Sequence, residues 1–124
     1  MNVYDAALFN PPAPVAVVTF INPANGLTVA DVKMLIDTGS DATLVPASVC
    51  LALQVEESDS PFAVELVDGQ RHELRAVRLK MKWSKYAING ESLIAQTEFG
   101  IIGRDILNRM RIRFDGPAQT WSFD

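Results

Sequence analysis

The chain has 124 residues, of which 48% are hydrophobic and 21% charged, and this balance excludes an intrinsically disordered protein. Eleven Lys and Arg against fifteen Asp and Glu give a formal net charge of −4, which argues against binding of nucleic acid through its phosphate backbone. The single Cys50 and the single His72 exclude an intrachain disulfide and a zinc site built from Cys and His. We therefore expect no metal and no cofactor, and we interpret Cys50 as a small buried hydrophobic residue.

The length fits one domain, for which we expect an N-terminal arm over residues 1–14 and a folded body over residues 15–124. Pro11, Pro12 and Pro14 separate the two parts, because proline cannot donate a hydrogen bond to a central strand. The arm contains no Lys or Arg and no long apolar run. We therefore expect no targeting signal, no membrane partner and a cytoplasmic location.

The first half of the body has the period of two that is typical of strands. Residues 15–21 are rich in β-branched side chains, and Asn25 with Gly26 supplies the positive φ angles that a tight hairpin needs. The return strand, residues 30–36, is expected to place four apolar side chains on one face: Ala30, Val32, Met34 and Ile36.

The pattern continues after a short gap. Residues 64–74 predict a second hairpin with its tip at Asp68 and Gly69. Residues 77–83 alternate most clearly, with four apolar side chains on one face and three basic ones on the other. We interpret the basic row as a solvated sheet face rather than a nucleic-acid surface, because no exposed aromatic residues are interleaved with it.

Two segments indicate helix. Residues 46–53 suit a turn or two, and residues 104–110 place Ile106, Leu107 and Met110 on one stripe. Residues 111–114 then alternate again, residues 115–117 form a turn, and residues 120–123 make a last strand. The predicted class is all-β with one short helix near the C-terminus.

The chemistry is expected in residues 34–46, where an apolar strand runs directly into Asp37, Thr38, Gly39 and Ser40. A carboxylate at the end of a buried strand loses solvation unless hydrogen bonds replace the water. Gly39 lets the backbone turn closely behind it, and the neighbouring hydroxyls can satisfy oxygens that water does not reach. Asp37 is thus a candidate general acid or base, although the tripeptide alone fits a simple Asx turn equally well.

A second segment decides between these interpretations. Residues 34–46 resemble the active-site loop of aspartic proteases, and residues 99–107, Phe-Gly-Ile-Ile-Gly-Arg-Asp-Ile-Leu, resemble the segment that opens the helix of retroviral proteases. Their order and separation suit a retropepsin-like domain over residues 15–124, and the small stand-alone bacterial members are the most similar. The resemblance implies a closed β-barrel of the acid-protease fold that acts as a homodimer, with a peptide or unfolded protein as substrate.

The resemblance assigns roles residue by residue. Asp37 matches the catalytic aspartate, Thr38 the residue whose hydroxyl links the two active-site loops across the dimer, and Gly39 the glycine lining the cleft. Asp41 matches the acid that pairs with the arginine of the helix-opening segment, here Arg104, in an ion pair that we interpret as structural. The flap is expected at residues 64–74, with its tip at Asp68, Gly69 and Gln70. This tip contains less glycine than viral flaps.

One such motif per chain predicts association, because hydrolysis by this chemistry needs two carboxylates that share a proton. Two-fold pairing would bring two copies of Asp37 together, one as base for water and one as acid for the scissile carbonyl. The predicted function is therefore a homodimeric aspartic endopeptidase, a peptide hydrolase with an acidic pH optimum. The alternative is a dimeric module of the same fold that binds extended peptides without cleaving them.

Three finer expectations follow. A Ser40 hydroxyl that donates to the Asp37 carboxylate would favour its ionised form, so Ser40→Ala should move the pH optimum upward. Residues 120–123 are the expected interface strand. For the arm, three roles stay open: covering a sheet edge, extending the interface, or removal by self-cleavage.

Overall fold

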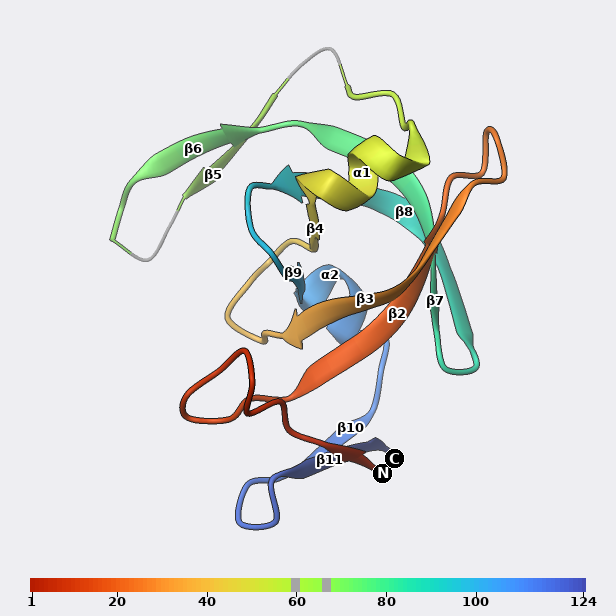
Figure 1. Ribbon diagram of the computed structural model, residues 1–124. Coiled ribbons are helices and arrows are strands. Elements are labelled where there is room, and N and C mark those ends of the chain that lie inside the picture. Colours follow the sequence, from red (N-terminus) through yellow and green to blue (C-terminus); the bar gives the residue numbers. More distant parts are fainter. Residues whose placement is uncertain (59–60, 66–67) are drawn as a thin grey trace.

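The computed structural model describes residues 1–58, 61–65 and 68–124 (Figure 1). Its strands are β1 (Asn2–Val3), β2 (Val15–Ile21), β3 (Thr28–Ile36), β4 (Leu44–Pro46), β5 (Phe62–Glu65), β6 (Arg71–Leu74), β7 (Ala76–Trp83), β8 (Tyr86–Ala95), β9 (Gly100–Ile102), β10 (Ile112–Asp115) and β11 (Thr120–Phe123). Its helices are α1 (Ala47–Leu53) and α2 (Arg104–Leu107). Six strands close a barrel in the order β2-β3-β9-β4-β8-β7, which confirms the all-β class.

The barrel core follows the alternation of the sequence. Val77, Leu79, Met81 and Trp83 of β7 are at most 3% exposed, while Arg78 and Lys82 on the same strand face solvent. The β2–β3 hairpin turns where predicted, with Gly26 at φ +78°. Phe20, Met34 and Ile102 fill the centre of the barrel.

One residue of β3 departs from the expected pattern. Ala30 is exposed, and Val29 packs against the core instead. The cause is an irregularity in the pairing with β2 between Val18 and Phe20, accompanied by a positive φ of 58° at Asp31. A bulge of this kind changes which side chains face the core.

The two helices are short. α1 covers the barrel with Val49, Cys50 and Leu53 and leaves Leu51 80% exposed. Burial of Cys50, together with the nearby charge of Glu57, raises the pKa of its thiol to about 11, which agrees with the expected structural role. α2 ends at Leu107, before the predicted residue 110, although Leu107 and Met110 pack against the core as expected.

A small sheet outside the barrel joins both ends of the chain, in the order β1-β11-β10. Trp121 and Phe123 of β11 contact the ring of Trp83, with ring centroids 5.8 and 4.9 Å apart, and so attach this sheet to the barrel. Because β1 pairs with β11, the arm covers a sheet edge, one of the three roles considered for it. β11 pairs with β1 on one side and with β10 on the other; the interface expected at residues 120–123 stays a prediction.

Candidate active site

The loop between β3 and β4 carries Asp37 at the end of a buried strand. β3 runs parallel to β9, with Ile36 opposite Ile102, and the Asp37 N–H donates to the Ile102 carbonyl over 3.1 Å. The segments that carry the two sequence motifs are thus adjacent strands of the barrel. The Asp37 side chain is half-buried, close enough to the surface to meet a substrate.

The turn holds the Asp37 carboxylate from behind. The Gly39 N–H donates to Asp37 Oδ1 over 2.8 Å, and the Ser40 N–H donates to the Asp37 carbonyl over 3.2 Å. A Cβ at position 39 would lie 3.1 Å from Asp37 Oδ1, so glycine gives this carboxylate its room. One carboxylate oxygen is bound by the loop, and Oδ2 has no partner within the described residues.

The Ser40 side chain does not form the predicted hydrogen bond. Its hydroxyl donates to the Ala42 carbonyl over 2.7 Å and not to the Asp37 carboxylate. Ser commonly bonds to the backbone two residues on in a turn, and the Ala42 carbonyl is such an acceptor. The expectation that Ser40 favours the ionised carboxylate is therefore wrong for this chain.

The ion pair expected between Asp41 and Arg104 is also absent. The ion pairs within residues 1–58, 61–65 and 68–124 join Lys33 to Asp5 and Arg113 to Asp124. Arg104 donates instead to the Thr38 carbonyl over 2.8 Å, while Asp41 is exposed. Arg104 still braces the loop, through a backbone oxygen rather than a carboxylate.

A buried polar group that the sequence analysis missed joins the two motifs. Thr43, 1% exposed, donates its hydroxyl to Asp105 Oδ1 over 2.7 Å and accepts from the Gly103 N–H over 3.1 Å. Asp105 also accepts from the Thr43 N–H at 3.3 Å and from the Ile106 N–H at 3.0 Å. A Cβ on Gly103 would collide with the Ala42 backbone. In the sequence, the only indication of this group was a single threonine, Thr43, directly before the apolar residues 44–46.

The predicted flap is the β5–β6 hairpin. Val64 pairs with His72, and Gly69 turns the tip with φ +84°; residues 66 and 67 of the predicted segment lie outside the described residues. The hairpin extends beyond the barrel, on the same side as the loop of Asp37 (Figure 1). Asp68, Gly69 and Gln70 are exposed, and the Gln70 N–H donates to Asp68 Oδ1 over 3.0 Å.

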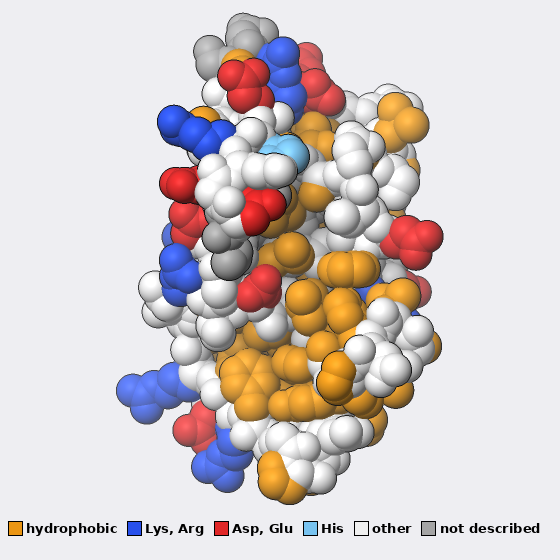
Figure 2. Space-filling view, turned by 90° about the vertical axis from the view of Figure 1, so that its left-hand side faces the viewer, with side chains coloured by type: hydrophobic (Ala, Val, Ile, Leu, Met, Phe, Trp, Pro, Cys, Tyr) orange, Lys and Arg blue, Asp and Glu red, His pale blue; other side chains and the backbone are white. Residues whose placement is uncertain are grey.

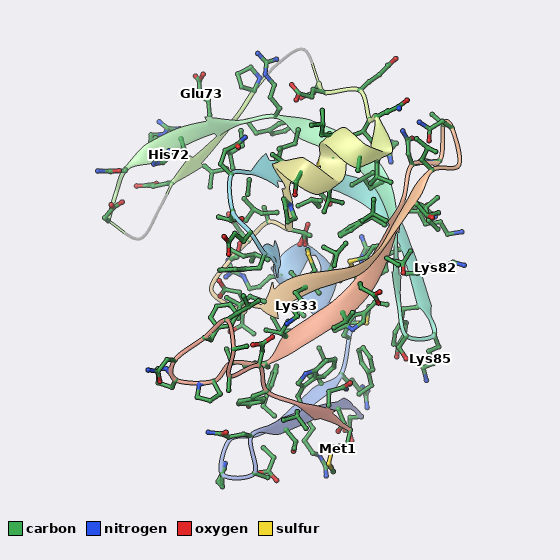
Figure 3. The ribbon with its side chains drawn as sticks, in the orientation of Figure 1. Met1, Lys33, His72, Glu73, Lys82 and Lys85 are labelled. Carbon is green, nitrogen blue, oxygen red and sulfur yellow. The ribbon has the colours of Figure 1, made fainter. Side chains whose placement is uncertain are left out.

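The face below the flap is rich in apolar side chains. Figure 2 shows hydrophobic side chains gathered over the lower half of this side of the molecule, with the charged residues of the flap above them. A groove beside the active-site loop has a mainly apolar wall from α2 and β10. It is lined by Thr38, Arg104, Leu107, Asn108, Met110, Ile112 and Phe114. The basic residues Lys82 and Lys85 lie on the opposite side (Figure 3).

The described residues contain no cluster of three or more His, Cys, Asp or Glu that could hold a metal ion. Within the same residues, neither helix is long and apolar enough to cross a membrane. The group that the loop presents is the Asp37 carboxylate, held by the Gly39 N–H.

The comparisons with known proteins bear on the fold. No family model and no curated protein matches the sequence. Among solved structures 251 chains match, and one is an EIAV protease complexed with the inhibitor HBY-793. It superposes with a TM-score of 0.62 at 22% sequence identity, over 78% of this chain and 86% of that chain. The chain has the retropepsin fold.

This result confirms the resemblance inferred from the two motifs and the closed barrel expected from it. The β3 strand that leads into the Asp37 loop and the β9 strand that leads into α2 are neighbours in this barrel, and the β5–β6 hairpin extends from the same side of it (Figure 1).

Proposed function

We propose that this chain is an aspartic endopeptidase that acts as a homodimer in the cytoplasm. The observation that carries the proposal is the half-buried Asp37 at the end of β3, with Gly39 donating to one carboxylate oxygen and the other oxygen left without a partner in the described residues. A carboxylate held in this way can take part in proton transfer. The retropepsin fold supports the same proposal.

The mechanism follows from the number of acids. Each chain supplies one Asp37, and two carboxyl groups about 3 Å apart cannot both be ionised. In a two-fold dimer the ionised partner would take a proton from water while the protonated partner donates to the scissile carbonyl oxygen. Because the pair must hold one proton, we expect an acidic pH optimum.

Substrate binding would use the flap and the apolar face. An extended peptide lying between the Asp37 loop and the β5–β6 hairpin can form backbone hydrogen bonds, and apolar pockets can select its side chains. Thr38, exposed and beside the groove, is placed so that its hydroxyl could meet the other loop of the dimer.

The direct test is hydrolysis of denatured protein across acidic pH, with and without a pepstatin-type inhibitor. Asp37→Asn should lower the rate by at least about 10²-fold, because it removes the general acid and base. Asp31→Asn is the matched control: Asp31 is exposed on the same strand, and its φ of 58° is one that Asn tolerates. Equal loss in both variants would contradict a catalytic role for Asp37.

A second function is favoured by the flap tip. The Gln70 N–H already donates to Asp68, so this tip has one backbone donor fewer for a substrate. A dimer that binds extended peptides without cleaving them would fit this arrangement. Peptide binding with no hydrolysis at any pH or protein concentration would support the binding module and exclude the endopeptidase.

A further inference from the structure

The β5–β6 hairpin has one apolar face and one charged face. Side chains directly opposite each other in an antiparallel ladder lie on the same face, and the faces alternate along each strand. One face carries two directly paired rows, Val64 with His72 and Phe62 with Leu74. The other face carries Ala63, Glu65, Arg71 and Glu73. Within β5 and β6, His72 is therefore the only titratable side chain on the apolar face.

The apolar face of the hairpin is turned toward the molecule. Val64 and Leu74 are half-buried, whereas all four side chains of the charged face are exposed. Glu73 points away from the barrel, and His72 belongs to the opposite face of the same strand (Figure 3). The one histidine of the chain lies beside apolar side chains in the view that looks onto the flap (Figure 2). A peptide between the hairpin and the Asp37 loop would therefore lie against the face that carries His72.

The His72 imidazole has no partner of its own within the described part of the chain. It is exposed and takes part in none of the hydrogen bonds or ion pairs found there. The charged side chains around it belong to the hairpin, the base of the hairpin, the Asp37 loop and the segment before β9: Glu65, Asp68, Arg71 and Glu73; Glu57 and Arg75; Asp37 and Asp41; and Glu98. No acid among them forms an ion pair with the imidazole, so its donors are free for a ligand.

The surroundings of His72 suit a carboxylate on an aliphatic stem. A protonated imidazole carries a positive charge and donates from both ring nitrogens, and imidazoles are mostly protonated at acidic pH. Val64, directly opposite on β5, offers apolar surface to the methylene groups of a Glu or Asp side chain. A Lys or Arg side chain of a peptide would be repelled at the same place. The apolar face of the flap thus has one position for a charged side chain, and that charge is negative.

We propose that His72 is a specificity-determining residue, which selects extended peptides that carry a Glu or Asp side chain under the flap. This inference rests on the proposed function for the peptide and for its place between flap and loop. The selection requires a protonated imidazole and an ionised carboxylate on the peptide. It is therefore greatest between the titration of the carboxylate and that of the imidazole, and it falls on both sides of this range.

The test uses a peptide that the protein cleaves, with Gln or Glu placed at one position at a time. In the wild type, Glu should raise kcat/KM over Gln by about threefold to tenfold at one position or more, at about pH 5, as expected for a partly exposed pair of opposite charges. The ratio should fall towards one at about pH 8, where the imidazole is neutral. His72→Gln keeps a hydrogen-bond donor but is neutral at every pH, and should cleave both peptides equally.

Two further variants separate the position of the charge from its sign. Arg71→Gln removes a positive charge from the neighbouring residue on the opposite face of the hairpin, and should keep the preference for Glu. His72→Lys keeps a positive charge at neutral pH, and should still prefer Glu at about pH 8, where the wild type does not. The inference is wrong if the wild type prefers Glu at no position, if the preference survives His72→Gln, or if Arg71→Gln loses it equally.

A binding measurement separates this inference from the proposed function. The same peptides, carrying a fluorophore, are titrated with the Asp37→Asn protein and followed by fluorescence anisotropy. Hydrolysis by the wild type that depends on Asp37 but is equal for the Glu and Gln peptides would overturn the selection and leave the endopeptidase standing. Tighter binding of the Glu peptides that His72→Gln abolishes, with no hydrolysis by the wild type, would confirm the selection and contradict the enzyme.

Discussion

The hydroxyl of Ser40 donates to the Ala42 carbonyl over 2.7 Å, and this bond decides what its removal should do. Ser40→Ala deletes one intramolecular hydrogen bond, so we expect the free energy of unfolding to fall by about 1 kcal/mol. The pH optimum of hydrolysis should not move, because the bond does not reach Asp37. Urea titration and a pH–rate profile measure the two quantities; Ser48→Ala, on the exposed side of α1, is the control. An upward shift confined to Ser40→Ala would show that the hydroxyl contacts the carboxylate in the active dimer.

Removing the Thr43 hydroxyl should cost more stability than removing that of Ser40, because the Thr43 hydroxyl forms two hydrogen bonds, one to Asp105 and one to Gly103. Thr43→Val keeps the shape of the side chain but leaves the Gly103 N–H without its acceptor and removes the hydroxyl donor of Asp105 Oδ1, which keeps only its bond from the Ile106 N–H. An unsatisfied buried group costs about 1–3 kcal/mol, so we expect a loss of about 2–3 kcal/mol in the free energy of unfolding. Urea titration measures it, and Thr43→Ser, which retains the hydroxyl, should lose less. Equal stabilities of the Val and Ser variants would contradict this role.

At the scale of single residues, the sequence was enough to predict where the backbone places Asp37 and Gly39, but not which acceptors the neighbouring side chains bond. The place of Asp37 and Gly39 at the end of β3, beside the segment of residues 99–107, could be predicted only from the two motifs taken together, because the tripeptide alone fits an Asx turn equally well. The partners of Ser40 and Arg104 could not be predicted, because both are backbone carbonyls, of Ala42 and Thr38, and every residue carries such an acceptor.

At the scale of elements, an ion pair between Asp5 and Lys33 holds the N-terminal arm against β3, and Asp5 can be titrated. Asp5 accepts hydrogen bonds from the Ala7 and Leu8 N–H groups and pairs with Lys33 over 3.0 Å. These bonds, the one from Leu8 foremost, lower the pKa of Asp5 below its usual 3.8. The ionised form is the one that is bound, so the contact stabilises the arm above this usual value and is lost as the pH falls through the lowered pKa.

This contact gives a measurable titration. The backbone amide resonances of Ala7 and Leu8 should move together on acidification, with a midpoint below 3.8. Lys33→Met removes the paired charge and should raise that midpoint, because the ionised carboxylate loses a stabilising partner. Lys82→Met, on the opposite side of the barrel, is the matched control. A midpoint that stays in place in Lys33→Met would contradict the contribution of the ion pair.

Local elements were predicted better than their partners. The β2–β3 and β5–β6 hairpins and the alternation of β7 follow from neighbouring residues, whose turn chemistry and period of two act over short distances. The pairing of β1 with β11 joins Asn2 to Trp121, and nothing in either short segment indicates the other. The arm therefore occupies one edge of β11, a contact that the sequence did not predict.

At the scale of the whole molecule, the barrel tolerates a change of most residues. The superposed EIAV protease shares 22% of its sequence with this chain at a TM-score of 0.62. Burial of alternate side chains constrains polarity and volume more than identity. The fold was therefore predictable from two motifs and a strand pattern.

If two chains share one catalytic site, an inactive variant should inhibit the wild-type protein by forming mixed dimers with it. When Asp37→Asn is added to an equal amount of wild type, at concentrations where both associate fully, half of the wild-type chains enter mixed dimers with one carboxyl group. Such dimers lack either the base or the acid, so the hydrolysis rate should fall to about half, and further additions should lower it towards zero. An equal mass of an unrelated protein should leave the rate unchanged. If adding Asp37→Asn protein also left the hydrolysis rate unchanged, each wild-type chain would carry a complete site. The proposed acid pair on the two-fold axis would then be wrong.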